Sequence, residues 1–143
     1  MSDQDNSAYE IVERFWPYDG PHSSDTVTDA ATAVGQLVRY MNNATWNPRL
    51  LNGPSLYRVL SSLNSAAYGL DQLLEQLAEA ARTLAGDSTM YDDRRDRPAS
   101  ATALELAEAI TAARRAFAGV PRREVERAAG LACHLGHDSV RDA

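Results

Sequence analysis

The chain has 143 residues, of which 44% are hydrophobic, and this is enough for one domain whose core can fold alone. No apolar run approaches the roughly 20 residues that span a bilayer, and the polar, acidic residues 1–6 do not resemble a secretory signal or a transit peptide. A single cysteine excludes an internal disulfide, so a reducing cytoplasm is the expected location.

All 14 basic residues are arginine, which excludes chemistry that needs a Schiff-base lysine or a phosphate-loop lysine. The net charge of −6 is unevenly distributed. Residues 1–30 hold seven acidic residues against Arg14 alone, and acidic residues and arginines balance in the rest of the chain. Attraction of the whole chain to nucleic acid is therefore not expected, although a local basic patch is compatible with this balance.

We interpret residues 1–23 as an acidic arm that carries several aromatic residues. Ser7 followed by Glu10 is a capping-box pattern, which favours a short helix that ends before Pro17. An extended segment docked on the rest of the protein is the alternative. The residues that we expect to bind a protein partner lie at the end of this run: Phe15, Trp16 and Tyr18.

A leucine heptad dominates the middle of the chain. One helix is predicted from about residue 24 to residue 43, and a second from Pro54 to Ala85 contains the repeat Leu56, Leu63, Leu70, Leu77 and Leu84. Apolar residues three and four positions after these leucines widen the stripe, which favours a bundle core over a narrow two-stranded zipper. The unbroken register favours one helix, kinked or straight at Gly69, over two helices hinged there.

Two further helices are predicted after a solvated loop at 86–100. The first faces inward through Ala103, Leu106, Ala107, Ile110, Ala113 and Phe117, and the second runs from about Pro121 to Leu135. The prediction is therefore an all-α fold, an antiparallel bundle of about four helices in a domain spanning 24–135, with a tail at 136–143. The leucine-rich helix is much longer than the first, and this mismatch leads us to expect a homodimer.

No pattern in the sequence indicates an enzyme, so we expect no catalytic residue, no metal ligand and no cofactor. Cys133, His134, His137 and Asp138 lie close together near the end of the chain but fit a structural zinc site poorly. The glutamate pairs 75/79 and 105/108 fall on polar helix faces, and no Glu-x-x-His motif accompanies them. Neither a Gly-x-Ser-x-Gly motif nor a glycine-rich phosphate loop is present.

One alternative function rests on a cluster of arginines at residues 113–129. Gly119 between two amphipathic segments resembles the turn of a bacterial helix-turn-helix repressor. The candidate DNA-binding residues are Arg114, Arg115, Arg122, Arg123 and Arg127. Arg115 at a usually small position, and the negative charges of Glu124 and Glu126, depart from that pattern. The competing interpretation is that these arginines are solvated and pair with Glu108, Glu124 and Glu126.

The segments AATAVGQLVRYMNNAT (30–45) and GLDQLLEQL (69–77) resemble uncharacterised helical proteins of high-GC actinobacteria, which are loosely associated with plasmids and mobile elements. The resemblance covers about residues 25–85 and implies no activity or functional residue. The leading hypothesis is a non-enzymatic, cytoplasmic helical protein that acts through protein–protein contact. It would be an adaptor or accessory component of an assembly, with a homodimer as its expected state and no membrane partner.

Overall fold

The computed structural model describes residues 7–136, and within them all regular structure is helical. The prediction of an all-α fold is confirmed, and each of the four long helices expected from the sequence is present. The described part of the chain falls into two units, divided between Leu50 and Leu51. The predicted tail, apart from Gly136, lies outside the described residues.

The first unit contains α1 (Ala8–Phe15) and α2 (Ser24–Ala44). The capping box predicted at Ser7 and Glu10 is formed, so the helical interpretation of the arm is correct and the extended alternative is wrong. Ser23 caps α2 in the same manner, through the backbone N–H of Thr26. Neither helix contains a buried residue, and the larger aliphatic side chains of α2 are exposed, namely Val27, Val34, Leu37 and Val38.

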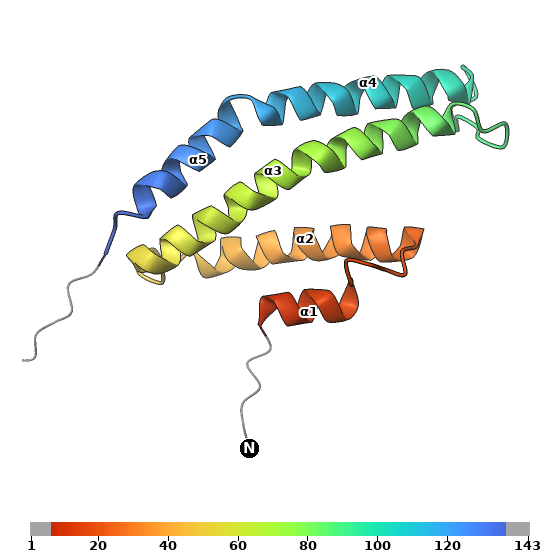
Figure 1. The fold of residues 1–143 in the computed structure, drawn as a ribbon. Coiled ribbons are helices and arrows are strands. Elements are labelled where there is room, and N and C mark those ends of the chain that lie inside the picture. The colour runs from red at the N-terminus through yellow and green to blue at the C-terminus, as the bar shows by residue number, and fades with distance from the viewer. Residues whose placement is uncertain (1–6, 137–143) are drawn as a thin grey trace, which may run out of the picture. The chain divides into compact units, whose positions relative to one another are not determined.

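The second unit is a helical hairpin of α3 (Gly53–Leu84), α4 (Ala99–Ala118) and α5 (Val120–Ala132). Figure 1 shows α4 and α5 following one another along α3, and both helices contact it. The Asn52 side chain caps α3, and Pro54 occupies its first turn, as predicted. Helix α3 is continuous through Gly69, which resolves the open choice in favour of a single helix.

The hairpin is closed by small residues rather than by the leucine repeat. The α3 residues turned toward the partner helices, which we call the seam, are half-buried or buried: Leu60, Asn64, Ala67, Asp71, Leu74, Ala78 and Ala81. Opposite them, the buried residues are again alanines, at 103 and 107 in α4 and at 129 and 132 in α5. Alanine lets helix backbones approach closely, so the pairing is tight but buries little apolar area.

The two ends of the hairpin meet closely. A Cβ built on Gly53, at the start of α3, would lie 2.8 Å from the carbonyl oxygen of Leu135, just after α5. Helices α4 and α5 together thus extend along the whole of α3. Within this unit α3 therefore does not overhang, because two helices in succession match its length. Within residues 7–136, no helix combines the length and the apolar character needed to cross a membrane.

Candidate interaction surface

The leucine repeat lies beside the seam rather than in it. Each seam residue follows a leucine of the repeat by one or four positions. At 3.6 residues per turn, the centre of the seam therefore lies roughly 70° around the axis of α3 from the centre of the leucine repeat. The leucines that remain on the open side are 37–44% exposed: Leu56, Leu63, Leu70, Leu73, Leu77 and Leu84. The sequence correctly predicted one apolar stripe, but α4 and α5 cover only one edge of it.

Helix α4 adds an exposed leucine to the side of the hairpin on which the α3 leucines lie. Leu106 precedes the seam residue Ala107 by one position, just as Leu77 precedes Ala78 in α3. In an antiparallel pair, residues with the same rotation from the seam lie on the same side of the hairpin. Leu106, predicted to face inward, is 49% exposed, and Phe117 is also exposed. We call the six α3 leucines together with Leu106 the leucine face.

The leucine face lacks charge along the full length of α3. The residues at its outer edge are uncharged: Ser55, Ser62, Gly69, Gln76 and Thr83. Four of the five charged residues of α3 lie on the opposite side, namely Arg58, Glu75, Glu79 and Arg82. The fifth, Asp71, lies in the seam. Depletion of charge is the compositional signal that marks the centre of protein interfaces.

The opposite side of the hairpin is held by an ion-pair network that the sequence did not reveal. Arg114 donates to both carboxylate oxygens of Asp71, through Nε at 3.1 Å and Nη2 at 3.0 Å, and Nη1 lies 3.1 Å from Glu75. These hydrogen bonds hold the pKa of Asp71 below and that of Arg114 above its ordinary value. Asp71 and Arg114 are 43 positions apart, so no local pattern pairs them.

The other candidate DNA-binding arginines are only partly available. Arg127 pairs with Glu124 at 3.4 Å, as expected if these arginines pair with nearby glutamates rather than with DNA. Arg122 stacks over the Tyr68 ring at 4.7 Å. Arg115 and Arg123 are exposed and form no ion pair within residues 7–136.

The backbone between these arginines also departs from the repressor pattern. A single residue, Gly119, separates α4 from α5, whereas a helix-turn-helix uses a turn of about three or four residues. Both helices also contact α3. DNA binding stays a prediction, and the geometry gives it no added support.

The aromatic residues predicted to bind a partner lie at the end of α1. Phe15 and Tyr18 are exposed, the latter to 87%, and Trp16 is half-buried. The rings of Phe15 and Trp16 are 6.0 Å apart, and the Arg14 guanidinium lies 5.6 Å from the Phe15 ring. Phe15 is thus partly covered by its own neighbours, whereas Tyr18 projects into solvent.

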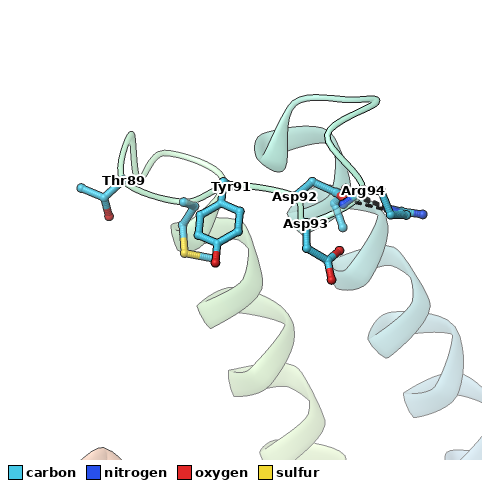
Figure 2. Close-up of a pocket in the computed structure, with 7 residues that line it drawn as sticks. Thr89, Tyr91, Asp92, Asp93 and Arg94 are labelled. Atoms are coloured by element: carbon cyan, nitrogen blue, oxygen red, sulfur yellow. Dashed lines mark hydrogen bonds and ion pairs between the residues drawn. The ribbon is translucent and has the colours of Figure 1, made fainter.

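The loop between α3 and α4 contains the one buried charged residue of the described chain. Figure 2 shows the hollow lined by Thr89, Tyr91, Asp92, Asp93 and Arg94. Asp92 is 8% exposed and accepts hydrogen bonds from the Arg94 backbone N–H, from the Arg94 guanidinium at 2.7 and 3.0 Å, and from the Thr102 hydroxyl. These bonds, first those from Arg94 and then that from Thr102, hold the pKa of Asp92 well below its usual range.

The loop was predicted to be solvated throughout, and for Asp92 that prediction is wrong. The Asp-Asp-Arg-Arg run has the composition of an exposed segment, and nothing in it marks the first aspartate as the anchor. Because its carboxylate accepts hydrogen bonds from both Arg94 and Thr102, Asp92 fastens the loop to the start of α4.

No group of three His, Cys, Asp or Glu residues placed to hold a metal ion occurs in the described part of the chain. Cys133 is exposed, and its Sγ lies 2.9 Å from the Gly130 carbonyl oxygen. His137 and Asp138, the other members of that sequence cluster, lie outside the described residues. Comparison with protein-family models, with curated proteins and with solved structures finds no match to this chain.

Proposed function

We propose that this protein acts through protein–protein contact rather than catalysis, as an adaptor or accessory component of an assembly, and that the leucine face is its main contact surface. The proposal rests on a charge-free row of half-exposed leucines that runs from Leu56 to Leu84, almost the full length of α3. Soluble monomers rarely expose continuous apolar patches larger than a few hundred Å². Burial of what remains exposed would contribute about 1 kcal/mol per leucine.

The aromatic end of α1 is a second contact element in this proposal. Tyr18 is almost fully exposed, and tyrosine supplies a large apolar surface with a polar tip, which is why it is enriched at interfaces. The acidic residues around it favour a partner with a basic surface. The cytoplasmic setting is also part of the proposal, and the presence of a single cysteine supports it.

Photo-crosslinking at two positions of α3 tests the contact surface without knowledge of the partner. One variant places benzoylphenylalanine at Leu77, on the leucine face, and the matched control places it at Gln72, an exposed residue on the opposite side. On irradiation of cells that produce the full chain, we expect a protein adduct from position 77 and little from position 72. Absence of an adduct at 77, or equal adducts at both positions, would contradict the proposal.

A further inference from the structure

We propose that the partner of the leucine face is a second copy of this chain, and that two α3 helices pack antiparallel about a two-fold axis at Leu70. This inference rests on the proposed function and identifies its partner. The five heptad leucines are symmetric about Leu70, so an antiparallel copy sets Leu56 against Leu84 and Leu63 against Leu77. Leu70 then meets its own counterpart. Such an arrangement is the isologous interface expected of a homodimer.

Residues beside the heptad fit the same axis. On one side of this helix pair, Leu73 lies within one residue of the level of Ala66 of the other copy, and Val59 within one residue of the level of Ala80, so that a large side chain lies beside a small one in both cases. Alternation of large and small residues is how facing helices interdigitate. Gly69 adds no side chain next to the axis, and a Cβ built there meets nothing within 4 Å in its own chain. The backbones can therefore approach closely at the crossing point.

Charge and length also favour a second copy. Each chain carries a net charge of −6, so two copies repel unless they meet where neither presents charge, and the leucine face is such a surface. The row from Leu56 to Leu84 is roughly 42 Å long at 1.5 Å per residue. Another α3 has the length that is needed to cover this row.

Cysteine crosslinking of the purified full chain tests both the partner and the orientation. In a Cys133→Ser background, Leu70→Cys places two thiols at the axis, within the Cα separation of roughly 4–7 Å that a disulfide needs. Mild oxidation should convert most of this variant to a crosslinked dimer. Leu84→Cys is the control, because its two copies would lie roughly 42 Å apart along the helices. It should crosslink only when mixed with Leu56→Cys.

The possible results separate the two proposals. A Leu84→Cys variant that crosslinks to itself would overturn the antiparallel arrangement. A dimer without crosslinking at Leu70 would overturn the axis. A monomeric protein whose position 77 still forms an adduct would overturn self-association and leave the proposed function intact. No adduct at position 77 together with a monomeric protein would end both proposals.

A second measurement leaves the leucines unchanged. In the same cysteine-free background, nitroxide labels at exposed Gln76 and Thr83 should give interspin distances of roughly 20 Å and roughly 40 Å in the antiparallel dimer. Similar short distances at both positions would indicate parallel helices, and the absence of a measurable distance at either position would indicate a monomer. Either result contradicts the inference.

Discussion

Asn64 is a seam residue whose side chain has an unsatisfied hydrogen-bond acceptor. Its Oδ1 atom is buried and has no hydrogen-bond partner among residues 7–136. A buried acceptor without a partner costs about 1–3 kcal/mol, and an apolar residue of similar size avoids that cost. We therefore expect Asn64→Leu to raise the free energy of unfolding by about 1 kcal/mol, measured by urea titration. Asn64→Asp, which adds a charge at the same point, should lower it, and a destabilised leucine variant would contradict this interpretation.

Two glycines of the second unit should respond in opposite directions to the same substitution. At Gly53 an added methyl group would meet the Leu135 carbonyl oxygen, and overpacking against backbone costs about 1–3 kcal/mol. At Gly130, inside α5, an added Cβ meets nothing within 4 Å, and alanine favours the helix by about 1 kcal/mol. Thermal unfolding should show a lower Tm for Gly53→Ala and a higher Tm for Gly130→Ala. Equal shifts would show that the ends of the hairpin do not meet as described.

At the scale of elements, the loop between α3 and α4 is fastened by Asp92. Because hydrogen bonds from Arg94 and Thr102 lower the pKa of Asp92 in the folded protein, its stabilisation is present above the ordinary value of 3.8 and is lost as the pH falls below that value. Asp92→Asn should therefore lower the Tm at pH 7 and reduce the further decrease between pH 5 and pH 2.

Asp93 supplies the matched control for that prediction. It is the adjacent carboxylate in the same loop, and it is exposed. Asp93→Asn should leave both the Tm at pH 7 and its acid dependence near those of the unchanged protein. If the two variants behave alike in circular dichroism melts across this pH range, Asp92 does not fasten the loop.

The helices were predictable from the sequence because their signals are local. The Ser7–Glu10 box, Pro54 and the heptad of leucines each act within one or two turns, and the structure confirms the helices they predict. The rotation of α3 against its neighbours was not predictable. It depends on Arg114 reaching Asp71 and on alanines in α4 and α5, and these residues are distant in sequence. For that reason the leucine repeat was predicted to form the core, and it instead lies half exposed.

At the scale of the whole molecule, we propose that the two sides of the hairpin have different roles. The side with Arg114, Asp71 and Glu75 holds α4 to α3 through charge, and the leucine face is left for a contact outside the hairpin. The alanine seam and the ion pairs of Arg114 hold the hairpin together without the leucine face, so its helices do not depend on contacts made there. Charges introduced on the leucine face should therefore disrupt association and leave the hairpin formed.

The most direct measurement is the light-scattering mass of the unchanged protein beside two variants, over a range of concentrations at physiological salt. Leu63→Glu/Leu77→Glu alters the leucine face, and Ser65→Glu/Gln72→Glu adds the same charge on the opposite side, at exposed positions. We predict twice the chain mass of 15.6 kDa for the unchanged protein and for the control. The leucine variant should have the mass of one chain with its helical content retained. A leucine variant that unfolds, or an unchanged protein that is monomeric at every concentration, would contradict the claim that α3 joins two chains.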